Sequence, residues 1–83
     1  MKTVQLKFFA RLREQLGIAE IAIPADQAPN LDSLMNWLQT QHPHWREALQ
    51  QPLTRAVNEE VVNGNVDLNP GDQVAFFPPV TGG

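Results

Sequence analysis

The chain has 83 residues and a formal net charge of −3 at pH 7, which suits one domain with a single core and leaves little room for a deep catalytic cleft. Because cysteine is absent, disulfides, thiolate metal sites and cysteine nucleophiles are excluded. The acidic balance and scattered basic residues argue against nucleic-acid or anionic-membrane partners, and with neither a signal peptide nor a long apolar run we expect a cytoplasmic protein.

The N-terminal quarter predicts two strands separated by a short helical turn. Residues 2–9 alternate apolar and polar side chains, which is the period of a half-buried strand. Two leucines four apart within residues 12–16 indicate a turn of helix that the following glycine closes. Residues 21–23 predict a second strand, which we expect to pair with the first as a hairpin partner.

The main helix is predicted over residues 31–41. Asn30 is a favourable N-cap, and leucines and a methionine recur at the spacing of one helical face. His42-Pro43 ends this helix. Trp45 and Leu49, again four apart, indicate a further short turn of helix over the core.

The remaining chain predicts short strands joined by turns. Strands are expected at residues 56–57, 61–62 and 73–77. Residues 63–65 and 69–72 are of the types that favour turns. The order strand, strand, helix, strand, short strand, strand favours an α+β roll of β-grasp type, a mixed sheet with one main helix across one face. We expect one domain over the whole chain.

An exposed aromatic patch is expected on the open face of this sheet. The first and last strands are central neighbours in a β-grasp roll, so Phe9 and Phe77 would share that face, and Val61 is a weaker candidate for it. Exposed apolar patches mark partner surfaces. The alternative is that both Phe-Phe pairs straddle a bulge and bury all their rings.

No internal residue predicts catalysis. His42 and His44 lack further ligands at metal-binding spacing and suit surface or helix-end roles. Glu59 and Glu60 resemble the solvated charges of a turn. Residues 63–65 form a turn rather than a phosphate cradle, because no strand-to-helix junction follows.

The C-terminal residues 78–83 predict an extended, flexible tail. Two prolines prevent helix and central-strand geometry, and two β-branched residues keep the backbone extended. Gly82 and Gly83 carry no side chain, so a carboxylate there would be sterically bare and open to attack once activated. A frayed end is the alternative interpretation.

Four segments together resemble one known family. The chain is similar to the molybdopterin synthase small subunits, which are ubiquitin-like sulfur carriers. The likeness covers essentially the whole length, and its most specific part is the ending. The segments that carry it are Phe8-Phe9-Ala10, Leu12-Arg13-Glu14 with Gly17, Ala56-Val57-Asn58, and Gly71-Asp72-Gln73-Val74-Ala75-Phe76-Phe77-Pro78-Pro79-Val80-Thr81-Gly82-Gly83.

The resemblance implies a mechanism. An activating enzyme related to the ubiquitin E1 class would adenylate the Gly83 carboxylate with ATP, and a persulfide sulfur would convert it to a thiocarboxylate. The tail would deliver sulfur to cyclic pyranopterin monophosphate (precursor Z) inside the large catalytic subunit of a heterotetramer. The resemblance implies no permanently bound cofactor, no metal and no catalytic acid or base in this chain.

The resemblance also implies which residues act. Gly83, with Gly82, would carry the chemistry. The partner-binding residues would be Phe9, Arg13, Val61, Phe77, Pro78, Pro79, Val80 and Thr81. Three alternatives remain: a thiamine-type sulfur carrier, a ubiquitin-like modifier that passes Gly83 to a lysine, and a plain β-grasp binding module.

Overall fold

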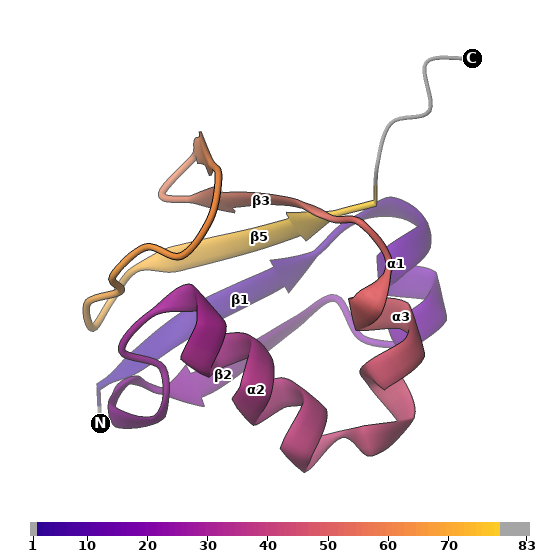
Figure 1. Cartoon of the computed structure of the whole chain (residues 1–83), viewed down its shortest axis with the longest axis horizontal. Helices are drawn as coiled ribbons and strands as arrows, with labels where there is room; N and C mark the ends of the chain where they lie inside the picture. Colours follow the sequence, from indigo (N-terminus) through magenta and orange to yellow (C-terminus); the bar gives the residue numbers. More distant parts are fainter. Residues whose placement is uncertain (1, 79–83) are drawn as a thin grey trace.

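The computed structural model describes residues 2–78 (Figure 1). Five strands form one mixed sheet in the order β2-β1-β5-β3-β4, in which β1 and β5 are parallel and the other neighbours antiparallel. The strands are β1 Thr3–Phe8, β2 Glu20–Pro24, β3 Thr54–Val57, β4 Glu60–Val62 and β5 Gln73–Phe77. The predicted β-grasp roll, with the first and last strands side by side in its centre, is confirmed.

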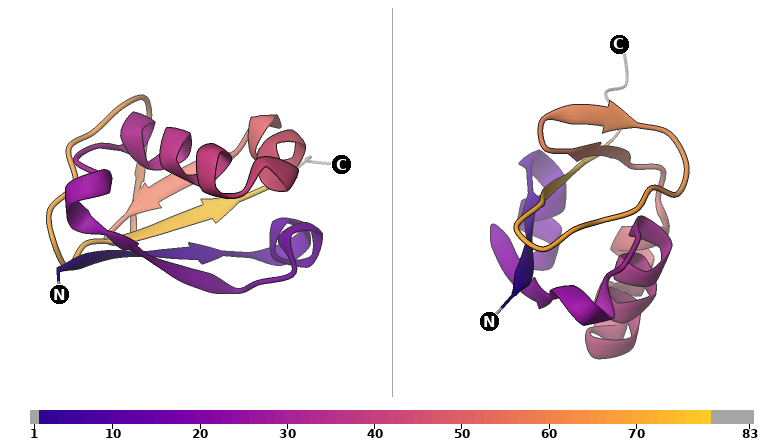
Figure 2. Two further views of the ribbon diagram at one scale, coloured as in Figure 1. Left: turned by 90° about the horizontal axis from the view of Figure 1, so that it is seen from below. Right: turned by 90° about the vertical axis from the view of Figure 1, so that its left-hand side faces the viewer.

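The helical segments complete the roll. They are α1 Ala10–Leu16, η1 Ala25–Gln27, α2 Leu31–Gln41, η2 Pro43–Trp45 and α3 Arg46–Gln50. Helix α2 lies across one face of the sheet, and none of the helices within residues 2–78 covers the opposite face (Figure 2). Among residues 2–78, no helix combines the length and apolar character needed to cross a bilayer.

Helix α2 has the predicted bounds because its cap and its apolar stripe agree. The side chain of Asn30 accepts a hydrogen bond from the Ser33 backbone N–H at 2.8 Å, which satisfies one of the free donors of the first turn. Leu31, Leu34 and Leu38 are buried against the sheet.

Strand β1 sets the two faces of the sheet by strict alternation. Val4, Leu6 and Phe8 are buried on the helix side, and β5 buries Val74 and Phe76 beside them. The side chains between these positions therefore belong to the open face.

An aromatic cluster closes the core beneath η2. The Phe8 ring meets Trp45 edge-on at 5.8 Å and lies 6.3 Å from Phe76, each distance joining ring centroids. Burial of Trp45 confirms the predicted helical turn over the core. Leu68, in the loop before β5, is also buried, although its loop position gave no periodic signal.

The structure changes one turn prediction. Glu60 was expected among turn charges, but it begins β4 and pairs with Val57 of β3. The turn itself is only Asn58 and Glu59, both with positive φ, which is the geometry of a two-residue type I′ hairpin.

Candidate functional site

The open face of the sheet carries a row of side chains that crosses four strands. In register, Lys7 of β1 lies beside Ala75 of β5, Ala75 beside Ala56 of β3, and Ala56 beside Val61 of β4. The centre of the row thus consists of two methyl groups between longer side chains. Such a row leaves a depression at the middle of the sheet.

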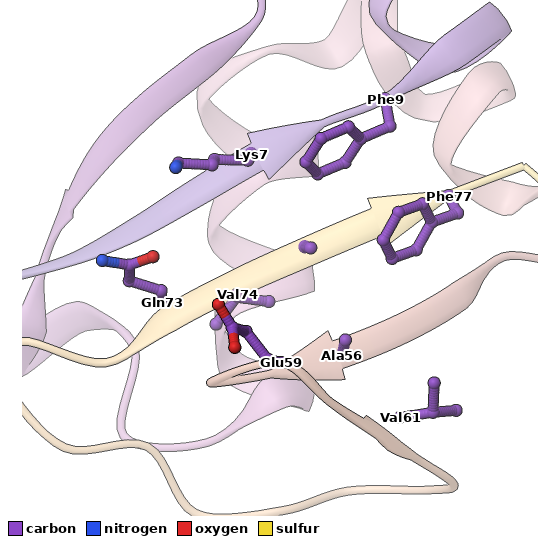
Figure 3. A pocket seen from close by; sticks show the side chains of 9 residues that line it. Lys7, Phe9, Ala56, Glu59, Val61, Gln73, Val74 and Phe77 are labelled. Atoms are coloured by element: carbon purple, nitrogen blue, oxygen red, sulfur yellow. The ribbon is translucent and has the colours of Figure 1, made fainter.

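Phe9 and Phe77 form one wall of this depression. Their rings stack with centroids 4.8 Å apart and planes inclined by 15° (Figure 3). Phe9 is 39% exposed. The predicted aromatic pair on the open face is therefore present, and the alternative of a bulge that buries both rings is wrong.

Backbone geometry at the end of β1 fixes the position of Phe9. The Phe9 N–H donates to the Phe76 carbonyl at 3.2 Å, so the ladder with β5 continues one residue beyond β1. Ala10 then adopts φ 55°, a left-handed conformation that is unfavourable for a residue with a Cβ, and the chain turns into α1. Phe9 consequently keeps extended geometry and points to the face opposite Phe8.

The depression is a groove of about 350 Å³ that is open to solvent on one side (Figure 3). Its floor and aromatic wall are apolar, and its other end is polar and bears one cation and one anion. We call it the open-face groove. The lining residues are Lys7, Phe9, Ala56, Glu59, Val61, Gln73, Val74, Ala75 and Phe77.

The β3–β4 hairpin is held against the groove by Asn58. Its side-chain Nδ2 donates to Asp72 Oδ1 at 3.1 Å, and its Oδ1 accepts from the Gln73 N–H at 3.0 Å. Its own backbone N–H donates to the Gln73 carbonyl at 2.7 Å. These bonds tie the turn to the start of β5 and place Glu59 at the rim of the groove.

The structure brings some of the predicted site residues together and separates others. Phe9, Phe77 and Val61 line the groove, and Val61 is 68% exposed. Pro78 follows β5 and is half-buried. Arg13 is exposed on α1 and is not a lining residue of the groove. The remaining predicted positions, Pro79, Val80, Thr81, Gly82 and Gly83, lie outside the described residues.

The histidines lie on the helix side, away from the groove. The His42 ring stacks on Trp45 with centroids 3.9 Å apart and planes inclined by 14°, and His44 meets Trp45 edge-on at 5.7 Å. Within residues 2–78, no group of three His, Cys, Asp or Glu side chains is arranged to hold a metal ion. The contacts of both histidines fit a packing role.

Several groove residues were not singled out from the sequence. Ala56 and Ala75 form the floor of the groove, and Lys7 and Gln73 lie at its polar end. The side chain of Asn58 hydrogen-bonds the β3–β4 turn to the start of β5. The alternation of β5 already places Ala75 on the face of Phe77. Its pairing with Ala56 becomes visible only once the strand register is known.

The strand order, the helix across one face and the apolar groove on the other define a ubiquitin-like β-grasp protein. The chain belongs to the ThiS family, whose model matches residues 6–83. It is 40% identical over 81 residues to the molybdopterin synthase sulfur carrier subunit of Escherichia coli (strain K12), and the match covers 96% of this chain and 99% of that one.

Two solved structures have the same architecture. The chain is 28% identical, with a TM-score of 0.71, to a chain of the complex of subunits 1 and 2 of the molybdopterin-converting factor from Helicobacter pylori 26695, and the match covers 98% of this chain and 99% of that one. Small archaeal modifier protein 1 of H. volcanii matches 96% of this chain and 100% of its own, with a TM-score of 0.79 and 23% identity. The second likeness concerns the fold alone.

Proposed function

We propose that this chain is a sulfur carrier of molybdenum cofactor biosynthesis and that Gly83 carries the sulfur. The observation that carries the proposal is similarity along nearly the whole chain to the E. coli carrier, 40% identical over 99% of that protein. The family model also extends to residue 83. The matched span includes the Phe-Phe-Pro-Pro-Val-Thr-Gly-Gly segment of residues 76–83.

The proposed chemistry begins at the Gly83 carboxylate. An activating enzyme of the E1 class uses ATP to convert the carboxylate to an acyl-adenylate and releases pyrophosphate. The terminal sulfur of a persulfide displaces AMP, and a second thiol cleaves the resulting acyl disulfide to leave a thiocarboxylate. Adenylation is needed because AMP is a far better leaving group than the oxide of a free carboxylate.

The second half of the cycle returns the carrier to its starting form. The thiocarboxylate sulfur attacks a carbon of cyclic pyranopterin monophosphate and displaces an oxygen substituent of that carbon. Water then hydrolyses the resulting thioester, which leaves sulfur on the pterin and a carboxylate on Gly83. Two such deliveries supply the two sulfurs of the molybdopterin dithiolene. This chain acts as a co-substrate, and the acid and base groups belong to the partner.

The partner of the proposed carrier is the large subunit of the synthase. The Helicobacter pylori structure, a complex of subunits 1 and 2 of the molybdopterin-converting factor, supports this assignment. We propose a heterotetramer of two small and two large subunits. The exposed Phe9 and Val61 and the half-buried Phe77 offer the apolar surface that such a complex needs.

Removal of Gly82 and Gly83 tests the proposal. The truncated chain should fold as the intact one does, because residues 2–78 contain all five strands and the core. With purified large subunit, activating enzyme, ATP and a persulfide source, we expect molybdopterin from the intact carrier and none from the truncated one. Molybdopterin synthesis by the truncated chain would refute the proposal.

The rival functions differ in what attacks the activated Gly83. A modifier would pass Gly83 to a lysine of a cellular protein. Because Arg55 is the last basic residue, trypsin digestion would leave residues 56–83 attached to that lysine through Gly83. The modifier-type structural neighbour supports only the fold. A thiamine-type carrier would restore thiazole synthesis instead of molybdopterin synthesis. The full-length match to the E. coli carrier favours the molybdopterin assignment.

A further inference from the structure

The loop after β4 begins with an asparagine that a glycine follows. Asn63 comes directly after Val62, the last residue of β4, and Gly64 is next. The chain has six asparagines, and only Asn63 precedes a glycine. A backbone nitrogen can attack the side-chain amide of the preceding asparagine, and glycine hinders this attack least because it has no Cβ. Asn63 is therefore the asparagine most open to reaction with its own backbone.

The structure leaves both reacting groups of this pair free. Asn63 and Gly64 are exposed. Within residues 2–78, neither the Asn63 side chain nor the Gly64 N–H takes part in a hydrogen bond. Gly64 has φ 85°, and no atom beyond its chain neighbours lies within 4 Å of the position that a Cβ would occupy. No contact in the described part of the chain therefore keeps the Asn63 amide away from the Gly64 nitrogen.

The other asparagines are held in place or followed by a hindering residue. The side-chain oxygens of Asn30, Asn58 and Asn65 each accept a backbone N–H, at 2.8–3.0 Å. Asn69 precedes a proline, whose nitrogen carries no hydrogen and cannot close the ring. Asn36 lies inside α2 and precedes a tryptophan, so helical geometry fixes its backbone. The structure thus distinguishes Asn63 from the five other asparagines.

We propose that Asn63 is a site of spontaneous deamidation, which gives the protein a second, more acidic form. The Gly64 nitrogen bonds to the Asn63 Cγ, the Cγ–Nδ2 bond breaks, and ammonia leaves with the proton of the Gly64 N–H. Water then opens the cyclic imide. Attack at Cγ gives aspartate, and attack at the backbone carbonyl carbon gives isoaspartate. Asparagine is among the thermally labile residues, and the reaction needs only water.

Isoaspartate at position 63 would lengthen the main chain by one carbon, the Cβ. The loop just beyond this point is bonded to the start of α2. The Asp32 N–H donates to Asn65 Oδ1 at 2.9 Å, and the Leu31 N–H donates to the Val66 carbonyl at 3.0 Å. An added atom shifts these acceptors, so the isoaspartate form should unfold at a lower temperature than the Asn63→Asp variant, which adds only the charge. Equal unfolding midpoints would overturn this consequence.

Timed incubation of the purified full-length chain at mildly alkaline pH tests the inference. Isoelectric focusing should show an acidic species that accumulates in the wild type and is lost in Asn63→Gln, whose longer side chain closes the ring far more slowly. The matched control is Asn36→Gln, an exposed position inside α2, which should form the acidic species as the wild type does. Fragmentation of the tryptic peptide of residues 56–83 should place the new carboxyl at residue 63.

A synthetic peptide of residues 60–67 sets the time scale, because it contains the same asparagine and glycine without the fold. If the peptide converts and the folded chain does not convert over the same incubation, the inference is wrong. An acidic species that persists in Asn63→Gln, or fragments that place the new carboxyl at another asparagine, would also overturn it. None of these outcomes bears on Gly83, so the inference and the proposed function stand or fall separately.

Discussion

Phe9 and Phe77 stack face to face on the open side of the sheet, 4.8 Å apart, while their neighbours Phe8 and Phe76 are buried on the other side. The Phe9–Phe77 pair thus lies on the open face of the sheet, and the Phe8–Phe76 pair lies on the buried face. One pair stabilises the fold, and the other is available to a partner. Substitutions of Phe8 and Phe9 separate these two roles.

Phe9→Ala should weaken binding of the large subunit and leave the fold nearly intact. The ring is partly exposed, so its loss should cost the stacking contribution, about 0.5–1.5 kcal/mol of the free energy of unfolding, together with a share of its apolar burial, and less than the loss of a fully buried ring. We expect at least tenfold weaker binding by calorimetry, as for an interface anchor. The control is Phe8→Ala, which removes a buried ring and should cost about 3–5 kcal/mol of stability. Wild-type affinity for Phe9→Ala would contradict the assignment of this surface.

Ala10 should tolerate glycine but not valine. With φ 55°, a β-branched side chain at this exposed position meets the backbone, and we expect Ala10→Val to lower the free energy of unfolding by about 1–2 kcal/mol. Glycine adopts positive φ freely, so Ala10→Gly should be close to neutral. Urea denaturation of both variants measures the difference. Equal stabilities would show that Ala10 does not hold this conformation in solution.

Asn58→Ala should destabilise the protein more than Asn58→Gly. Both variants lose the side-chain bonds to Asp72 and to the Gln73 N–H, worth about 0.5–1.5 kcal/mol each. Alanine also has to adopt φ 50°, which adds about 1 kcal/mol. Chemical denaturation gives both values. A glycine variant as stable as the wild type would mean that the side-chain bonds contribute nothing to stability.

His42→Ala should lower stability slightly without affecting the partner surface. Its ring stacks on Trp45, and loss of the stack should cost about 0.5–1 kcal/mol, measured by thermal unfolding. The matched control is His44→Ala, which removes an edge contact of an exposed ring and should cost less. Both variants should bind the large subunit with wild-type affinity. Impaired binding by His42→Ala would place part of the interface on the helix side.

The sequence predicts those parts of the fold that depend on local periodicity. The bounds of α2 follow from Asn30 and the leucine spacing, and the exposure of Phe9 follows from the alternation of β1. Both signals lie within one element. The fold class could be predicted because these elements occur in an order that few architectures accommodate.

The features that were missed depend on pairing between distant segments. Ala56 and Ala75 form a floor only because β3 and β5 align them. The Asn58 side chain, in the β3–β4 turn, reaches Asp72, which is 14 residues away and directly precedes β5. Glu60 was assigned to the turn because a two-residue loop and a longer one share the same polar composition. The alanine floor, the Asn58–Asp72 bond and the place of Glu60 all depend on strand register, and periodicity within one strand does not encode register.

The most direct test of the central claim is the intact mass of the carrier after incubation with its activating enzyme, ATP and a persulfide source. We expect a mass gain equal to the exchange of one oxygen for one sulfur, and no gain when Gly83 is deleted. An unchanged mass under conditions that convert a known carrier would contradict the claim that Gly83 carries sulfur.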